Sequence, residues 1–329
     1  MTAVVETTGV LTSEARRDVR IPTVARRRRL ANGAATWLLY LATAIAAGAL
    51  LLVIIALLRK GASSLDAGFF TRRLPVFSNA DASAIAKLPA ALRAKYHIGS
   101  TTQLGVGPAI AGTLVSTAMA SLLAIPLGVL GAIYLNEFGK QNLMARIVRF
   151  FADVMTGVPS IVMGLFVYTV WVVRYGTSGP SAFAAALALA CLMLPIVIRA
   201  SEEMLRLVPD ELRSASTAIG ARRWETTLRV VLPAALGGIT SGAMLAVARA
   251  AGETAPVLFT IGVIGGNQPA NWSLSGGNTT LAAQIFNNAK QGDPRQQQFA
   301  WAAAITLVLL VFLLTFVARL IANRFSTSR

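Results

Sequence analysis

Hydrophobic residues along this chain are gathered into long uncharged runs, and the polar segments between the runs carry most of the charge. Each run approaches or exceeds the roughly 20 residues that an α-helix needs to cross the hydrocarbon core of a bilayer. The pattern therefore predicts an all-α integral membrane protein with six transmembrane helices. The predicted spans are residues 35–58, 104–135, 154–173, 181–198, the run that starts at Val230, and residues 299–318.

The same pattern divides the chain into a membrane core and flanking segments. We expect a basic cytoplasmic tail at residues 1–34, a first transmembrane helix at 35–58 and a mixed extracytoplasmic loop at 59–107. Residues 108–322 then form a core of five transmembrane helices, and residues 323–329 form a second cytoplasmic tail. Candidate packing points in the loop are Phe69, Phe70, Pro89 and Tyr96.

Composition and charge agree with membrane insertion and set the orientation. The 329 residues are 55% hydrophobic and only 13% charged, which is too apolar for an ordinary soluble domain. The net charge of +16 raises the question of nucleic acid, but the basic residues lie in the N-terminal tail and at the ends of apolar runs. The positive-inside rule then places both termini in the cytoplasm, and no nucleic-acid partner is expected. One cysteine and one histidine cannot form a metal cluster or a catalytic set, so neither is predicted.

Prolines inside the predicted spans mark places where a helix bends, because proline has no backbone N–H and its ring collides with the preceding turn. Pro126 is expected to bend the second span, and Pro195 to break the fourth. In the third span, Pro159 and Ser160 follow Gly157 and form a candidate gate, since carbonyl groups freed in a membrane need protein or a cavity to satisfy them. A kink that serves only packing explains these residues equally well.

The segment Val208–Pro233 is basic and has helical spacing, although it lies between two membrane-spanning runs. Pro209 and the acidic residues after it suit the first turn of a helix, where a missing N–H costs nothing and negative charge is favoured. Gly220 ends this helix, and apolar residues at helical spacing then start another, so we expect two short helices joined by a bend. The first helix has a face of small and apolar side chains that suits a protein partner: Leu212, Ala215, Ser216 and Ile219.

This segment resembles the EAA loop of ABC importer permeases, in which a Glu-Ala-Ala triplet, a glycine and a Leu-Pro pair mark the coupling helices. Here Ser214-Ala215-Ser216 stands at the triplet, Gly220 at the glycine and Leu232-Pro233 at the pair. Ser214 departs from the glutamate usual in the family, which leaves the partner's matching contact undefined. The resemblance implies a type I ABC importer permease fold with a cytoplasmic coupling-helix loop at residues 208–233. It also implies that the chain is coupled to an ATPase through Leu212, Ala215, Ser216, Ile219 and Gly220.

Arg249 and Glu253 are charges that fall within a predicted span, and their spacing of four residues places them on one helix face. An ionised side chain near the bilayer centre costs about 2.5–3.5 kcal/mol on insertion scales, so both must face protein or water. A mutual ion pair that locks the fifth helix into the bundle is one explanation. The other is a substrate site, because the planar fork of an arginine donates two parallel hydrogen bonds to a tetrahedral oxyanion.

The stretch Arg249–Pro256, with Gly-Glu-Thr-Ala-Pro as its most specific part, is similar to the corresponding stretch of the PstA-type permeases of bacterial phosphate importers. The similarity covers about residues 108–325. It implies a multi-pass subunit of the bacterial plasma membrane that moves inorganic phosphate inward, with Arg249, Glu253 and Thr254 in the substrate pathway.

The resemblance also implies a set of partners. These are a homologous second permease, two cytosolic ATPase subunits, an extracytoplasmic phosphate-binding protein and membrane lipid. The chain has no G-x-x-x-x-G-K-[ST] phosphate loop, so ATP and Mg²⁺ are expected on the ATPase, and this chain is expected to be no enzyme and to hold no cofactor.

Three other functions stay open at this point. A permease for another oxyanion, such as sulfate or phosphonate, fits the same residues. A secondary transporter would need its own ion-coupling residues, and an intramembrane enzyme would need a nucleophile–base set or metal ligands.

Overall fold

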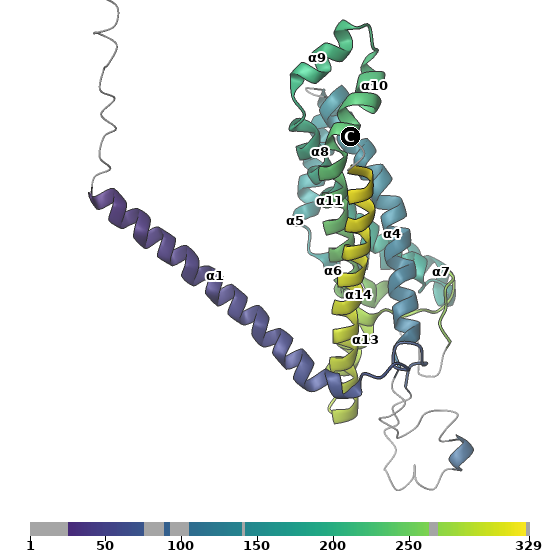
Figure 1. The fold of residues 1–329 in the computed structure, drawn as a ribbon. Helices are drawn as coiled ribbons and strands as arrows, with labels where there is room; N and C mark the ends of the chain where they lie inside the picture. The colour runs from purple at the N-terminus through teal and green to yellow at the C-terminus, as the bar shows by residue number, and fades with distance from the viewer. Residues whose placement is uncertain (1–25, 76–88, 93–104, 140–141, 263–268, 327–329) are drawn as a thin grey trace, which may run out of the picture. The chain divides into compact units, whose positions relative to one another are not determined.

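The computed structural model describes residues 26–75, 89–92, 105–139, 142–262 and 269–326 (Figure 1). Its contacts divide the chain into two compact units, Met1–Ile55 and Ala56–Arg329, and the second unit contains the helix bundle. Several predicted segments lie outside the described residues. These are most of the N-terminal tail, much of the loop at 59–107 with Tyr96, and residues 327–329.

The elements of the described residues are all helical. The α-helices are α1 (Arg26–Gly61), α4 (Gly107–Ile133), α5 (Leu143–Gly157), α6 (Ser160–Val167), α7 (Val173–Tyr175), α8 (Ala182–Arg206), α9 (Asp210–Ala218), α10 (Arg223–Thr226), α11 (Leu232–Gly252), α12 (Ala255–Thr260), α13 (Leu281–Ala289) and α14 (Pro294–Ser326). Two 3₁₀ turns are η1 (Ala62–Ser64) and η5 (Gly176–Ser178), and three π-helical turns are η3 (Tyr134–Phe138), η4 (Tyr168–Val172) and η6 (Thr227–Val231).

Among the described residues, five helical stretches are long and apolar enough to cross a membrane, and there are six if the bent pair formed by α5 and the helix after it counts as one span. The prediction of an all-α membrane protein is therefore confirmed. The five stretches are Leu30–Ser64, Gly107–Phe138, Ala182–Arg206, Arg223–Gly252 and Pro294–Leu320.

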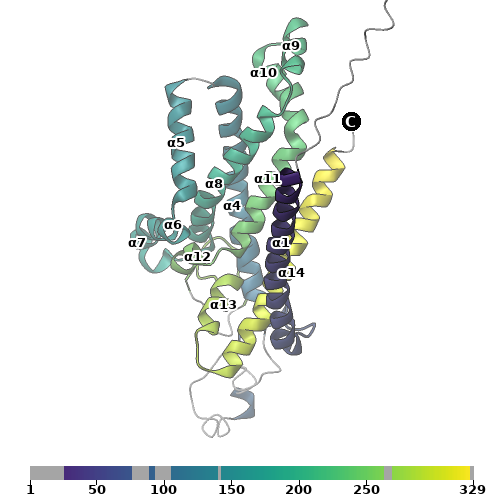
Figure 2. The same cartoon turned by 90° about the vertical axis from the view of Figure 1, so that its left-hand side faces the viewer.

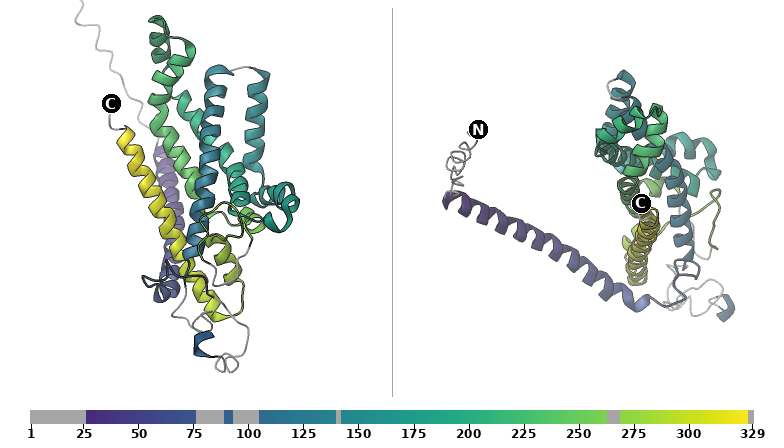
Figure 3. Two further views of the ribbon diagram at one scale, coloured as in Figure 1. Left: turned by 90° about the vertical axis from the view of Figure 1, so that its right-hand side faces the viewer. Right: turned by 45° about the horizontal axis from the view of Figure 1, so that its top comes forward.

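The helices of the second unit run side by side, with short helices at both ends and at one flank (Figure 2). Helices α9 and α10 lie at the end where α14 finishes, whereas α13 and the start of α14 lie at the opposite end (Figures 2 and 3). Helices α6, α7 and α12 lie between these ends, on the flank that Figure 2 shows at its left. The loop at residues 208–233, called the coupling segment below, and the α11–α12 junction are therefore at different levels of the bundle.

The centre of the bundle is built mainly from small side chains, which let the helices approach closely without large apolar residues. Helices α4 and α8 pack most extensively, and a Cβ on Gly128 of α4 would lie only 2.7 Å from Cγ1 of Val197 on α8. Helix α11 joins the same core. The buried members of this core are Ala120, Ala124, Ala185, Ala186, Leu189, Met193, Val197, Ala246, Ala250, Val257, Ile261 and Ala283.

Two prolines lie inside continuous helices. Pro195 is in the interior of α8 and Pro126 is in the interior of α4, so the prediction that Pro195 breaks the fourth span is wrong. A proline removes one backbone hydrogen bond, and neighbouring helices in a membrane bundle compensate for that loss. Pro195 is buried within the bundle, which provides such a neighbour, whereas Pro126 is exposed.

The predicted third span at residues 154–173 is sharply bent, and it falls within the bent pair that starts at α5. Helix α5 ends at Gly157, α6 begins at Ser160, and the two helices are bent by 106°. Val158 is extended, with φ −73° and ψ 129°, as expected for a residue that precedes a proline. The bend predicted at Pro159 and Ser160 is thus present, and its role as a gate stays a prediction.

The predicted continuous fifth span is also interrupted. Helix α11 ends at Gly252, Glu253 is extended, and α12 begins at Ala255. The ring of Pro256 would collide with the carbonyl group of Gly252, four residues earlier, which explains why the helix stops there. The short α12 then packs against α6, where a Cβ on Gly164 would lie 2.4 Å from the Pro256 Cα.

Part of the predicted loop at 59–107 packs as part of the second unit. Phe69 is completely buried and contacts Phe299 at a ring-centroid distance of 6.2 Å, which confirms it as a packing point, whereas Phe70 is exposed. Gly61 lies so close to α14 that a Cβ there would be 2.8 Å from the carbonyl oxygen of Trp301. The end of α1 and the start of α14 are therefore in direct contact.

We expect Gly164→Ala to destabilise the protein and Gly157→Ala to leave it unchanged. The added methyl at position 164 would meet backbone atoms of Pro256, which cannot move cheaply, whereas nothing lies within 4 Å of a Cβ at position 157. Overpacking of this kind costs about 1–3 kcal/mol. Thermal unfolding of the two detergent-solubilised variants measures the difference, and equal melting temperatures would contradict the α6–α12 contact.

Candidate functional site

Arg249 and Glu253 are brought together at the break between α11 and α12. Arg249 lies in the last turn of α11, and its Nε donates to Oε1 of Glu253 at 3.3 Å. Glu253 is the residue that follows the helix, so the expectation that both charges share the face of one continuous helix is wrong. The pair forms across a helix end, where the extended backbone of Glu253 turns its carboxylate back towards Arg249.

The two members of this pair differ in exposure. The side chain of Arg249 is 68% exposed and that of Glu253 is 18% exposed. Within the described part of the chain, Arg249 donates its side-chain hydrogen bond to Glu253, and the donor atom is Nε. The two Nη groups, which form the outer edge of the guanidinium, therefore remain available to an anion or to a partner chain.

Thr254 is adjacent to this pair, and the helix that follows the bend at Pro159 packs against α12. Thr254 is half-buried and directly precedes α12, and its side chain does not cap that helix. Gly164 and Pro256, which hold α6 and α12 together, each lie shortly after their helix break. The structure thus brings the two predicted irregular segments to the same flank of the bundle.

The first helix of the coupling segment exposes most of the face that the sequence predicts. Leu212 is 44% and Ile219 is 87% exposed, and Ala215 is exposed as well. Ser216 differs, because it is buried and its hydroxyl forms a 2.9 Å hydrogen bond with Thr226 of α10. The prediction that Ser216 belongs to an outward-facing contact surface does not fit this geometry, since the side chain joins the two arms of the loop.

Gly220 ends α9 as predicted. Its φ of +88° lies in the left-handed region that favours glycine. The amide of Gly220 donates to the Thr217 carbonyl and the amide of Ala221 donates to the Ser216 carbonyl, which is the Schellman arrangement. Any side chain at position 220 is therefore strained whatever its charge.

The second short helix predicted for this segment is not separate. Helix α10 begins after Arg222, whose amide donates a hydrogen bond to Glu225 Oε2 at 2.9 Å. It continues through η6 into α11, so that Arg223–Gly252 forms one apolar stretch. The prediction of two short helices is wrong in its second half, because no glycine or other helix-ending residue separates Trp224 from Pro233.

Two buried acidic residues near the coupling segment were not predicted from the sequence. Glu137 is 5% exposed and pairs with Arg213 at 3.0 Å, and Glu202 is 1% exposed and pairs with Arg149 at 2.8 Å. Arg206 also contacts Glu202, at 2.7 Å. The sequence did contain a signal for Glu137, because this acid follows directly after a long uncharged run. An acid that is buried at such a place needs a basic partner.

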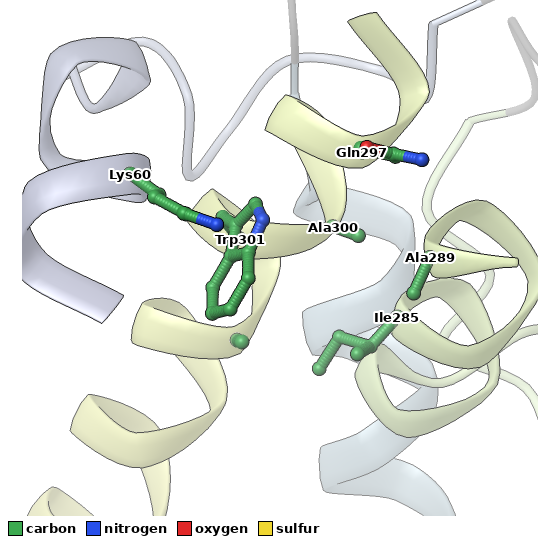
Figure 4. Close-up of a pocket in the computed structure, with 7 residues that line it drawn as sticks. Lys60, Ile285, Ala289, Gln297, Ala300 and Trp301 are labelled. Atoms are coloured by element: carbon green, nitrogen blue, oxygen red, sulfur yellow. The ribbon is translucent and has the colours of Figure 1, made fainter. Parts of the chain in front are cut away.

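One pocket of about 350 Å³ lies at the other end of the bundle, between α13, α14 and the end of α1 (Figure 4). Its walls are mostly apolar, and the Lys60 ammonium lies over the Trp301 ring at 4.9 Å from the centroid. The pocket is lined by Lys60, Ile285, Ala289, Gln297, Ala300, Trp301 and Ala304. None of the predicted site residues lines it, so the site is assigned from the charge pair and not from this hollow.

Comparison with known proteins identifies the family. The model of the family "Binding-protein-dependent transport system inner membrane component" matches residues 124–327. The phosphate transport system permease protein PstA 1 of Mycobacterium tuberculosis (strain H37Rv) is 45% identical over 226 residues, which are 68% of this chain and 71% of that protein. PstA of Yersinia pestis is 41% identical over 217 residues, 66% of this chain and 72% of the relative.

Solved structures agree on the fold. An inward-facing structure of the MetNI methionine ABC transporter matches with a TM-score of 0.52 and 22% sequence identity, over 67% of this chain and 94% of that chain. At this identity the likeness concerns the fold alone. The region matched by the family model contains the coupling segment and the α11–α12 break, and on these grounds the chain belongs to the family of inner membrane components of binding-protein-dependent transport systems, as a PstA-type ABC importer permease.

Proposed function

We propose that this chain is the permease subunit of an ATP-driven importer of inorganic phosphate, with Arg249 as the residue that contacts the anion. The observation that carries the proposal is the geometry of Arg249. Its Nε is held by Glu253 at 3.3 Å while the side chain remains 68% exposed. One edge of the guanidinium is therefore fixed, and the other edge is free for two parallel hydrogen bonds to a tetrahedral oxyanion.

The charge of the site supports an anion that carries a proton. A guanidinium stays ionised at all relevant pH values and supplies the positive charge. Glu253 adds a carboxylate, which repels a fully ionised anion but accepts a hydrogen bond from a protonated oxygen. Hydrogenphosphate has such an oxygen and sulfate at neutral pH does not, so the pair favours phosphate, in agreement with the names of the relatives.

The proposed assembly follows from the same placement. Arg249 is mostly exposed on its own chain, so a homologous second permease is proposed to cover it and complete the pathway. The exposed Leu212, Ala215 and Ile219 are proposed to dock on one of two cytosolic ATPase subunits, which bind ATP and Mg²⁺. An extracytoplasmic phosphate-binding protein is proposed to deliver the anion at the end that carries α13. The chain itself is proposed to catalyse no reaction.

The orientation is part of this proposal. With α9 in the cytoplasm, the end of α14 is cytoplasmic too, because both lie at the same end of the bundle (Figure 2). The N-terminal tail is proposed to be on the same side, where its arginines obey the positive-inside rule.

Arg249→Lys tests the anion contact. Lysine keeps the charge but offers a single ammonium in place of the planar fork, so we expect phosphate uptake to fall at least tenfold while the complex assembles normally. Arg295→Lys is the matched control, because Arg295 also pairs with an acid, Asp293 at 3.2 Å, and lies in the first turn of α14. ATP-dependent uptake of radiolabelled phosphate into proteoliposomes measures the effect, and competition with sulfate and phosphonate tests the alternative substrates.

Glu253→Gln separates the substrate role from a structural ion pair. Because Arg249 is mostly exposed, loss of its counter-charge should cost little stability, and the variant should reach parental abundance. Uptake should fall, with weakened discrimination against sulfate. If Glu253→Gln and Arg249→Lys both assemble and transport at the parental rate, the pair lies outside the pathway and the site assignment is wrong.

Ala215→Glu tests docking on the ATPase. The new carboxylate would be placed in the apolar face of α9, so we expect the ATPase to be lost on purification and uptake to fall at least tenfold. Ser214→Glu is the matched control, because it adds the same side chain one residue earlier, where the family usually carries glutamate. Gly220 is unsuitable for this test, since its φ of +88° makes any substitution strained. Parental ATPase binding by Ala215→Glu would remove the docking claim.

A further inference from the structure

Arg213 holds three elements together at the end of the bundle that carries the coupling segment. Its Nη1 donates to the Val208 carbonyl at 2.6 Å and to Oδ1 of Asp210 at 3.1 Å. Its Nη2 donates to the Leu205 carbonyl at 2.8 Å and to Oε1 of Glu137 at 3.0 Å. One guanidinium therefore joins the end of α8, the start of α9 and the turn η3 that ends α4.

Glu137 connects the same turn to the other arm of the coupling segment. Its carboxylate binds Arg213 before the Gly220 turn, and its backbone carbonyl accepts a hydrogen bond from Nη2 of Arg223 after it. The guanidinium of Arg223 also lies over the ring of Phe138, at 5.5 Å from the centroid. Both arms of the coupling segment are thus fixed to one residue at the end of α4.

Burial makes this connection stiff. The side chain of Glu137 is 6% exposed and that of Arg213 is 16% exposed. A buried carboxylate that loses its partner is strongly disfavoured, so the two side chains are held together when the loop moves. By contrast, Asp210 is 86% exposed, and its contact with Arg213 is correspondingly weak.

Helices α4 and α8 also lead from this end of the bundle towards the proposed substrate pair. Both helices contribute to the close-packed core that also contains Ala246 and Ala250 of α11 and Val257 of α12. Ala250 directly follows Arg249, and Val257 lies four residues after Glu253. Because such a core resists compression, a displacement of α4 and α8 is passed on to the α11–α12 break.

We propose that Arg213 and Glu137 are positioning residues that transmit movement of the coupling segment to the α4–α8 pair, and so link ATP hydrolysis to transport. This inference rests on the proposed function, in which an ATPase docks on α9. It assigns the link to a specific buried ion pair, and predicts that removing the pair separates the two activities without removing either partner.

The test uses the complete complex in proteoliposomes and measures ATP hydrolysis and phosphate uptake in the same vesicles. In Glu137→Gln and in Arg213→Gln, we expect hydrolysis within about twofold of the parent and uptake at least tenfold lower. The double variant should lose no more than Arg213→Gln alone, because that variant already lacks the interaction with Glu137. Glu202→Gln is the matched control, since Glu202 is an equally buried acid that pairs with arginines of α5 and α8.

Each result decides the question. Parental uptake per ATP hydrolysed in both single variants overturns the inference, and so does an equal loss in Glu202→Gln. If Arg213→Gln fails to assemble, Glu137→Gln, which is nearly isosteric, decides alone. Failure of both to assemble shows that the pair is only structural and also overturns the inference. Absence of uptake by the parental complex would instead contradict the proposed function, so the two failures are distinguishable.

Discussion

The contact between Gly164 of α6 and Pro256 of α12 is the interaction on which the centre of this permease depends. Two helices are broken within the membrane region, and the backbone groups freed at such breaks must be covered by protein or face a water-filled cavity. Helix α6 packs on α12, with a Cβ-free residue at the point of contact, so the helices that follow the two breaks support each other. The ring of the same Pro256 fixes where α11 ends, and therefore where Arg249 and Glu253 meet.

Charged residues differ in burial and in pairing between the two levels of the bundle. At the coupling segment, the acid Glu137 is buried and paired with Arg213, which gives the loop one defined geometry. At the α11–α12 break, Arg249 is mostly exposed and has a single acidic partner among the described residues. The first arrangement suits transmission of force through a fixed structure, and the second suits an anion that must bind and leave again.

Much of the fold could be predicted from the sequence, because length and hydropathy decide whether a helix spans a membrane. Gly220 was also predictable, since helix ends in the left-handed conformation favour glycine. The effect of each proline was not. Pro195 stays inside α8, whereas α11 ends before Pro256, although the same local rule for proline applies to both residues. The burial of Ser216 and the pairing of Glu137 with Arg213, 76 residues apart, depend on tertiary contacts.

The π-helical turn Thr227–Val231 has a geometric consequence for the whole subunit. A π turn accommodates one residue more than an α turn, and one residue corresponds to about 100° of rotation about a helix axis. The direction in which α11 presents Arg249 is therefore set relative to α10 and the coupling segment by the residue count of this turn. Deleting one apolar residue of this turn would leave the charged residues of the sequence unchanged. It would nevertheless rotate Arg249 away from the face it now occupies.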